Sequence, residues 1–307
     1  MAKLDVVGLG MNVLDILIRL DEMPTWQHPG SPSRVLVDGG GWVATALVAA
    51  QKFGLQTGFI GTHGNDQNGR IKHQLLAQYG VDLTYDFEMP HPENQLCLVY
   101  VRMSDGERFF SGPVDFSAYS LDPSLLDHAY ITQAQLLHLD GYHHQAALQA
   151  ATWMRAAGKR VVLDGGTREG PHLGEDQHAL AALTDILIGG SGYLQALTGE
   201  ADIEKAGRIA LGMGPSVVVQ TEGSHGSYTF STEDCFHTPA FPIEAIDTTG
   251  AGDVFHGAYL YGLVQGWRLT EIARFATAAA ALECLTVGGR VGIPTLQEIN
   301  AFLAQQP

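Results

Sequence analysis

The sequence contains few cysteines and no long apolar run, and each shortage narrows the class of protein. Its cysteines are far apart and match no metal-binding spacing; they are Cys97, Cys235 and Cys284. An odd number of cysteines without a disulfide framework is typical of a reducing compartment. No stretch reaches the ~18–20 apolar residues of a membrane-spanning helix. The chain also enters an apolar, strand-like run at Leu4 without a signal peptide. We therefore expect a cytoplasmic protein with no membrane partner.

Positive charge is also scarce. The chain has 17 Lys and Arg residues against 33 Asp and Glu residues, which gives a formal net charge of −16. Nucleic acids and anionic membranes reward clustered Lys and Arg, so this balance argues against both as partners. A small anionic ligand in a local pocket stays compatible with it. Apolar residues make up 45% of the chain, which is enough for a sizeable core.

Short apolar runs alternate with amphipathic segments along most of the chain. Strands are expected at residues 4–10, 57–61, 135–139, 160–164, 185–188 and 216–220. Helices are expected at residues 41–53, 67–79, 143–157, 252–264 and 270–286. This repetition with short links favours an α/β fold, in which a mostly parallel sheet has helices on both faces. No repeat or low-complexity linker is visible, so we expect a single domain over residues 1–307.

Two regions, residues 15–38 and 83–111, break this alternation. Both contain apolar strand-like runs with no helix between them, and Asp105-Gly106 is a typical hairpin turn. We expect these regions to form antiparallel strands inserted within the domain. A small sheet of this kind would stand off the main sheet like a lid.

The segment richest in chemistry is Asp-Thr-Thr-Gly-Ala-Gly-Asp-Val-Phe-His-Gly, residues 247–257. Gly250, Ala251 and Gly252 let a ligand approach the backbone closely, and the N–H groups at the start of the following helix favour an anion. Asp253 falls in the first turn of that helix, where a carboxylate can take a proton from an attacking hydroxyl. A carboxylate there also favours the helix dipole without any chemistry. The length of the run favours a general base beside a phosphoryl-binding site.

At these residues the chain resembles the ribokinase-like (PfkB) carbohydrate kinases, and the likeness covers nearly the whole length. Five further segments are similar to motifs of that family and follow in the same order; they are residues 10–15, 39–41, 61–69, 221–226 and 288–294. The resemblance implies a ribokinase-like fold, with a central, mostly parallel sheet flanked by helices and a small antiparallel β lid. It implies ATP and Mg²⁺ as cofactors, a small sugar as substrate, and a homodimer formed through the lid.

The resemblance also implies roles for individual residues. Asp253 would be the base that deprotonates a primary hydroxyl, with Gly250, Ala251 and Gly252 in the anion hole. Substrate hydroxyls would be held by Asn12, Asp15, Gly40 and Gly41. The nucleotide would be bound by Thr221, Gly223, Gly226 and Gly288. A potassium-type ion would be bound by Asp247 and Thr249.

The chain departs from the family pattern at two places. Thr45 stands where most members have an Asn that contacts substrate, and a hydroxyl has a shorter reach than an amide. Gly190 and Tyr193 stand where the family has the Asn and Glu that support Mg²⁺, and neither side chain offers a suitable oxygen ligand. Asp164, at the end of an expected strand, is a candidate substitute for the missing metal support.

Several other residues have more than one interpretation. Asp140 follows a strand and could contact substrate or cap a helix. Arg168 could meet substrate or phosphate, or lie in a solvated loop. Arg102 and Arg108 could bind a phosphorylated substrate, although exposed hairpin arginines are the preferred interpretation. The histidines show no His-Glu-x-x-His spacing, so no histidine metal site is expected.

Together these features predict an ATP-dependent kinase that phosphorylates a primary hydroxyl of a sugar or sugar-like molecule. A nucleoside or a phosphorylated sugar is an alternative substrate within the same class. A second alternative is a non-catalytic, ligand-binding relative that is degraded at the magnesium motif.

Overall fold

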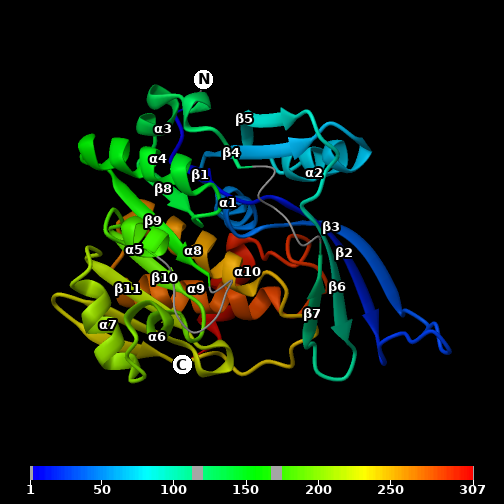
Figure 1. The fold of residues 1–307 in the computed structure, drawn as a ribbon. Helices are drawn as coiled ribbons and strands as arrows, with labels where there is room; N and C mark the ends of the chain where they lie inside the picture. Colours follow the sequence, from blue (N-terminus) through cyan, green and yellow to red (C-terminus); the bar gives the residue numbers. More distant parts are fainter. Residues whose placement is uncertain (1–2, 113–119, 167–174, 307) are drawn as a thin grey trace.

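The computed structural model describes residues 3–112, 120–166 and 175–306. Within these ranges the chain forms one large and one small β-sheet with helices on both faces of the large sheet (Figure 1). The strands of the large sheet, in spatial order, are β13 (Cys235–Thr238), β12 (Ser227–Ser231), β11 (Val217–Thr221), β10 (Ile186–Gly189), β9 (Arg160–Gly165), β8 (Leu136–Leu139), β1 (Val6–Leu9), β4 (Thr57–Gly64) and β5 (Asp82–Met89). The predicted α/β class is confirmed.

Neighbouring strands from β11 to β5 pair in parallel, and β12 and β13 extend the sheet as an antiparallel hairpin. Successive residues of a central strand enter two different cores, because side chains alternate across a sheet. In β1, Val6 packs in one core and Val7 in the other. A strand that is buried on both faces has a nearly continuous apolar sequence, and for this reason these strands could be predicted from the sequence.

Each face of the large sheet is covered by its own group of helices. One group consists of α1 (Trp42–Lys52), α2 (Gln67–Ala77), α8 (Ala251–Gln265), α9 (Leu269–Glu283) and α10 (Leu296–Ala304). The other consists of α3 (His128–Gln133), α4 (His144–Ala156), α5 (Glu175–Ala181), α6 (Tyr193–Thr198) and α7 (Ile203–Leu211). None of the helices in the described part of the chain is long and apolar enough to cross a membrane.

Helices α1 and α8 pack closely, and this contact positions the segment of residues 247–257 at the start of α8. A Cβ on Gly257 would lie 2.4 Å from the carbonyl oxygen of Ala46, so only glycine allows this approach. The residues of α1 from Val43 to Ala50 are all buried. The N-terminus of α8 is therefore fixed against the start of α1.

The small sheet consists of β3 (Arg34–Gly40), β2 (Val13–Leu20), β6 (Leu96–Arg102) and β7 (Arg108–Ser111). It extends to one side of the large sheet (Figure 1). The expected antiparallel hairpins are present as β2–β3 and β6–β7, and β2 joins β6 in parallel. Residues 82–89, which we expected in the lid, instead form β5 and pair with β4 in the large sheet. Tyr85 and Phe87 pack there against the second core, which explains the difference.

The segment 61–69 links the two sheets rather than forming part of the site. Asp66 caps α2 by accepting hydrogen bonds from the backbone N–H groups of Gly69 and Glu93. The Glu93 carboxylate lies 2.7 Å from the Lys72 ammonium, and both side chains are fully buried. A buried ion pair of this kind holds the entry to β6 against α2.

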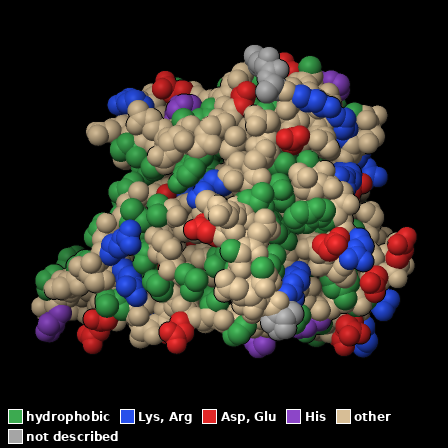
Figure 2. All heavy atoms as spheres, turned by 180° about the vertical axis from the view of Figure 1, so that it is seen from behind, with side chains coloured by type: hydrophobic (Ala, Val, Ile, Leu, Met, Phe, Trp, Pro, Cys, Tyr) green, Lys and Arg blue, Asp and Glu red, His purple; other side chains and the backbone are tan. Residues whose placement is uncertain are grey.

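Charged side chains are dispersed on the face shown in Figure 2. Among the described residues seen there, Lys and Arg side chains are scattered between acidic ones and do not form one basic patch. The homodimer and the cytoplasmic location stay predictions from the sequence.

Candidate active site

A cavity of about 580 Å³ lies between the small sheet and the helices of the large sheet. Its walls come from β2, β3, β6, β7, β9, β10 and β11 and from the first turns of α1 and α8. Ten predicted site residues line it; they are Asp15, Gly40, Gly41, Thr45, Asp164, Thr221, Thr249, Gly250, Gly252 and Asp253. The topology thus brings together segments more than 200 residues apart in the sequence.

The start of α8 has the geometry of an anion-binding site. Gly250 precedes the helix with φ +89°, and a Cβ there would lie 2.8 Å from the Gly289 Cα, so glycine is required. Gly252 lines the cavity, and a Cβ on it would meet no other atom within 4 Å. The first N–H groups of a helix have no partner within that helix, so they are available to an anion in this space. Ala251 lies in the same turn but is not among the lining residues.

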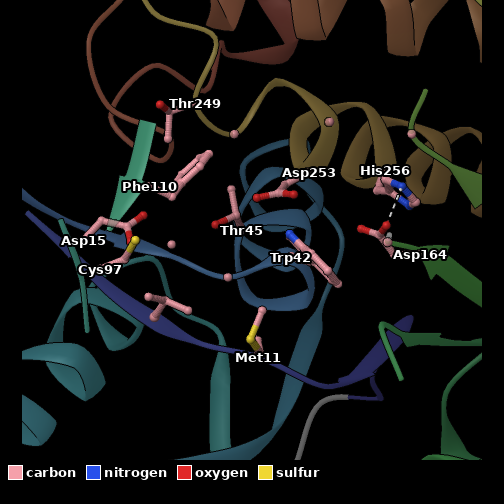
Figure 3. A pocket seen from close by; sticks show the side chains of 18 of the residues that line it. Met11, Asp15, Trp42, Thr45, Cys97, Phe110, Asp164, Thr249, Asp253 and His256 are labelled. Atoms are coloured by element: carbon pink, nitrogen blue, oxygen red, sulfur yellow. Dashed lines mark ion pairs between the residues drawn. The ribbon is translucent and has the colours of Figure 1, made fainter. Parts of the chain in front are cut away.

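Asp253 lies in the first turn of α8, between Asp15 on one side and the His256–Asp164 pair on the other (Figure 3). Burial raises the pKa of Asp253 to about 8, and the negative charge of Asp15 adds to this effect. The charges of Arg108 and Arg290 act in the opposite direction. A carboxylate with a pKa near the working pH is suited to accept a proton in catalysis.

Asp15 occupies the opposite wall of the cavity, on β2. A Cβ on Gly40 would lie 2.0 Å from its Oδ2 atom, so the glycine makes room for this carboxylate. Burial raises the pKa of Asp15 to about 7, and the nearby Arg290 lowers it in part. Gly41 and Thr45 line the cavity beside it. These groups form a polar wall that can bind hydroxyls.

Arg290 is the support of this wall and was not predicted as a site residue. It is fully buried, and its Nη2 donates to Asn12 Oδ1 at 2.8 Å and to the Gly40 carbonyl. Its Nε lies 3.3 Å from Thr45 Oγ1. Asn12 and Thr45 are thus held by an arginine, and Asn12 itself does not line the cavity.

Asp38 completes the arrangement around Arg290. One of its carboxylate oxygens accepts hydrogen bonds from the backbone N–H groups of Arg290 and Val291, and the other accepts from Gly39 N. The C-terminal loop is therefore bound to β3. No local sequence pattern predicts this contact, because its partners are about 250 residues apart in the chain.

Arg108 is an exposed hairpin arginine, as preferred from the sequence, and it also reaches the cavity wall. Its Nη1 donates to Thr248 Oγ1 in the segment of residues 247–257. Arg102 is exposed too, but it pairs with Asp105 at 2.7 Å and does not line the cavity. The small sheet therefore reaches the anion-binding loop and places one cation there.

The expected nucleotide residues divide into one that lines the cavity and three that shape loops. Thr221, at the end of β11, is in the wall. Gly226 has φ +91°, and a Cβ on it would lie 2.0 Å from the Thr238 carbonyl oxygen. Gly223 begins a short 3₁₀ turn, η3 (Gly223–His225). Gly288 has φ +108° and donates its N–H to Asp247 Oδ2.

The predicted monovalent-cation residues lie behind the anion-binding loop. Asp247 is fully buried, and its Oδ1 accepts from Thr249 N at 2.9 Å. Within the described chain, Thr249 Oγ1 has no hydrogen-bond partner. Among the described residues, the buried carboxylate oxygens of Glu283 likewise have no partner of good hydrogen-bond geometry. Burial raises the pKa of Glu283 well above its usual value, the negative charge of Asp247 raises it further, and a contact with the Cys284 side chain lowers it slightly. These oxygens of Asp247, Thr249 and Glu283 are all potential cation ligands, so a bound cation would satisfy them and reduce the repulsion between the two carboxylates.

Asp164 lines the cavity at the end of β9, as a candidate for metal support requires. Burial raises its pKa well above the usual value, and the charges of Asp253 and Asp140 add to this effect. Tyr193 fills the space where the family's Glu would stand, because a Cβ on Gly165 or Gly189 would lie 2.4 Å from its side chain. Tyr193 is buried against these strands and provides no carboxylate.

A further carboxylate near this position was not expected from the sequence. Glu222 accepts hydrogen bonds from Ser191 Oγ and Gln220 Nε2. Ser191 and Gly190 both line the cavity. Glu222 therefore lies beside the loop that lacks the family's metal-supporting residues.

Two other predicted contacts are placed differently or lie outside the structure. Asp140 accepts hydrogen bonds from the backbone N–H groups of Met11 and Tyr142, each at 2.8 Å, and it is not among the lining residues. It acts in this structure as a link between two strand ends. Arg168 lies outside the described residues.

Comparison with known proteins agrees with this site. The chain belongs to the pfkB family of carbohydrate kinases, whose family description matches residues 1–296. It is 25% identical to the 5-dehydro-2-deoxygluconokinase of Shouchella clausii, over 99% of this chain and 97% of that protein. It is also 25% identical to a nucleoside kinase of Methanothermobacter thermautotrophicus, over 98% of this chain and 96% of that protein.

A solved structure shows the same fold. The ribokinase of Arabidopsis thaliana, crystallised with ribose and ATP, superimposes with a TM-score of 0.82 at 24% identity, covering 98% of each chain. The chain is accordingly a phosphotransferase of the carbohydrate-kinase class.

Proposed function

We propose that this protein is an ATP-dependent kinase that phosphorylates a primary hydroxyl of a sugar or sugar-like small molecule, with Asp253 as general base. The observation that supports it most is the position of Asp253, which lies between the anion-binding start of α8 and the polar wall of Asp15. A substrate hydroxyl bound on that wall and a phosphoryl group at the helix N-terminus would meet at its carboxylate.

In the proposed reaction, Asp253 accepts the proton of the substrate hydroxyl as its oxygen attacks the γ-phosphorus of ATP. The bond from that phosphorus to the bridging oxygen breaks, and ADP leaves. Backbone N–H groups at Gly250–Asp253 stabilise the charge on the transferred group. Arg108 adds a positive charge to the same region.

Metal ions have plausible ligands on both sides of this centre. Asp164 and Glu222 are the carboxylates near the loop that lacks the family's Asn and Glu, and either can support the Mg²⁺ that accompanies ATP. The partnerless oxygens of Thr249 and Glu283, close to Asp247, support a potassium-type ion behind the anion hole. Mg²⁺ would neutralise charge on the phosphates, and K⁺ would fix the loop that carries them.

A nucleoside is the second candidate substrate, and the cavity wall gives a specific reason. Phe110 from β7 and Met11 both line the cavity, and in Figure 3 Phe110 lies on the side of Asp15. An aromatic ring and a thioether favour a flat apolar group such as a nucleobase.

A substrate panel tests the proposal. Purified protein is assayed for ADP formation with ATP, Mg²⁺ and a panel of sugars, sugar acids, sugar phosphates and nucleosides, with and without K⁺. We expect turnover on at least one compound and a phosphate ester on its primary hydroxyl. Binding of ATP without transfer to any member would favour the non-catalytic alternative.

The pH dependence of kcat/KM follows from the two raised carboxylate pKa values. Asp253 must be ionised to accept a proton, so activity should fall as the pH drops through its pKa. With values of about 8 for Asp253 and about 7 for Asp15, we expect kcat/KM to rise from about pH 6 to about pH 9 and to level off above. Because the two carboxylates interact, the apparent values belong to the pair. A profile that stays flat from pH 5.5 to 9, in protein shown by circular dichroism to be folded, would contradict this assignment.

A further inference from the structure

A second cluster of potential metal ligands lies directly beside Asp253. It consists of His138 on β8, Asp164 on β9 and His256 on α8, one helical turn beyond Asp253. One ligand atom from each residue lies within 4.8 Å of the other two. All three residues are buried. Figure 3 shows His256 and Asp164 facing each other at the cavity wall.

The histidines of this cluster have unused ring nitrogens. Within the described chain, neither ring nitrogen of His138 has a partner of good hydrogen-bond geometry. Burial lowers the pKa of His138, and the backbone of Val162 is close enough to raise it slightly against this larger effect. Nδ1 of His256 is also without a partner. The remaining contact, from His256 Nε2 to Asp164 Oδ1, is 3.4 Å long. Buried polar atoms are almost always satisfied, so these vacant nitrogens need an explanation.

The charge around the cluster favours a cation. Asp253 and Asp140 are the charged groups whose fields act most strongly on Asp164. The positive charges that act on Asp253 come from Arg108 and Arg290. A divalent ion between His138, Asp164 and His256 would reduce the repulsion among these acids.

We propose that His138, Asp164 and His256 bind a divalent ion of the first transition series, of the Zn²⁺ type. Two imidazoles and one carboxylate are ligands preferred by such ions, whereas Mg²⁺ prefers oxygen. Metal–ligand bonds of about 2.0–2.2 Å require these atoms to lie closer together than 4.8 Å, which small side-chain rotations achieve. Three protein ligands leave at least one coordination position open. Asp164 and His256 line the cavity, so this position can face a water molecule or a phosphate oxygen.

The described chain has another histidine cluster, which consists of His63, His73 and Asp86. His73 Nδ1 forms a hydrogen bond of 2.7 Å with Asp86 Oδ2, and His63 Nδ1 lies 3.0 Å from the same oxygen. Among the described residues, His63 Nδ1 and Asp86 Oδ1 have no partner of good hydrogen-bond geometry. This cluster can therefore also bind added metal, and the experiment has to separate the two clusters.

Cobalt is a suitable probe, because its visible absorption reports the coordinated ion. Chelator-treated protein carrying His73→Asn, which removes one ligand from the cluster of His63, His73 and Asp86, is titrated with Co²⁺ in the absence of ATP. We expect one Co²⁺ per chain, displaced by Zn²⁺ but not by a large excess of Mg²⁺. Adding His256→Asn or His138→Asn should weaken binding by about 100-fold or more, since even changes outside the coordination shell cost 10–100-fold. Metal should raise the unfolding temperature of the His73→Asn protein and not of these two variants.

His143→Asn is the matched control. His143 is also a buried histidine, with 1% of its surface exposed, and its Nδ1 accepts a hydrogen bond from Leu121 N. Its replacement should leave the Co²⁺ affinity within about threefold. Circular dichroism without metal establishes that each variant is folded, and two ligand variants guard against the failure of one. Absence of Co²⁺ and Zn²⁺ binding below millimolar concentration, or unchanged affinity in both ligand variants, would overturn the proposal. These readouts do not involve kinase activity, so they stand apart from the proposed function.

Discussion

Asp253→Asn is expected to lower kcat by about 10²–10⁴-fold, the range that a general base contributes. The amide has the shape of the carboxylate but cannot accept the hydroxyl proton. The backbone N–H groups of the anion-binding turn are unchanged, so the affinity for ATP should stay within about threefold. Steady-state kinetics and calorimetric ATP titration measure the two effects. Asp21→Asn, which changes an exposed carboxylate, is the control and should retain wild-type turnover.

The same substitution should raise the unfolding temperature by a few degrees at neutral and alkaline pH. The pKa of Asp253 is about 8 in the folded protein against 3.8 for an ordinary aspartate, so the folded state binds the proton more tightly. The ionised carboxylate therefore costs stability increasingly as the pH rises from 3.8 towards 8. Asn removes that cost, and the gain should be larger at pH 8 than at pH 5. A lower unfolding temperature with wild-type turnover would contradict both the role and the burial of Asp253.

Arg290→Met is expected to reduce the free energy of unfolding by about 3–5 kcal/mol, because removing a buried cation leaves nearby buried carboxylates uncompensated. The change leaves the buried carboxylates of Asp15 and Asp38 without their cation. It also removes the donor to Asn12 Oδ1 and to the Gly40 carbonyl. Urea denaturation measures the effect through the midpoint, provided that the slope is unchanged.

Two further variants sharpen the Arg290 prediction. Arg102→Met removes an exposed arginine and should leave the denaturation midpoint unchanged. Arg290→Lys keeps the charge but loses the planar fork, so it should recover only part of the stability. An Arg290→Met protein as stable as wild type would show that the wall of Asp15 does not depend on this arginine. The KM for the sugar should also rise in the Met variant, because Asp15 would be protonated more readily.

The sequence predicted the features that depend on local pattern. Buried strands, helix-stopping glycines and the run of residues 247–257 are continuous signals, and they located the parallel sheet, the anion-binding turn and Asp253. The opposite wall at Asp15 came from the family resemblance. The cavity lining shows that these segments do meet.

Features that depend on distant contacts were missed. Arg290 lies in a quoted motif, but its partners Asn12, Gly40 and Thr45 are about 245–278 residues away. In the sequence, nothing distinguishes Arg108 from an ordinary hairpin arginine. Its contact with Thr248 becomes visible only when the fold places the hairpin beside that residue.

Tertiary packing also explains why the sequence did not predict the sheet to which residues 82–89 belong or the clustering of the histidines. The alternating residues 82–89 suit the edge of either sheet, and tertiary packing decides in favour of the large one. The histidines have no motif spacing, yet the fold brings His138 and His256 to Asp164. The sequence signal for this cluster is proximity to predicted site residues, because His256 lies three residues after Asp253 and His138 lies two residues before Asp140.

The central claim, that Asp253 removes the proton during phosphoryl transfer, is tested most directly by a single turnover. Wild-type or Asp253→Asn protein, in excess over a limiting amount of the best substrate of the panel, is mixed rapidly with saturating ATP and Mg²⁺ and quenched on the millisecond to minute scale. This isolates the chemical step from product release. The account predicts that the Asn variant binds both substrates but forms the phosphate ester at least about 100-fold more slowly. A transfer rate within tenfold of wild type would contradict it.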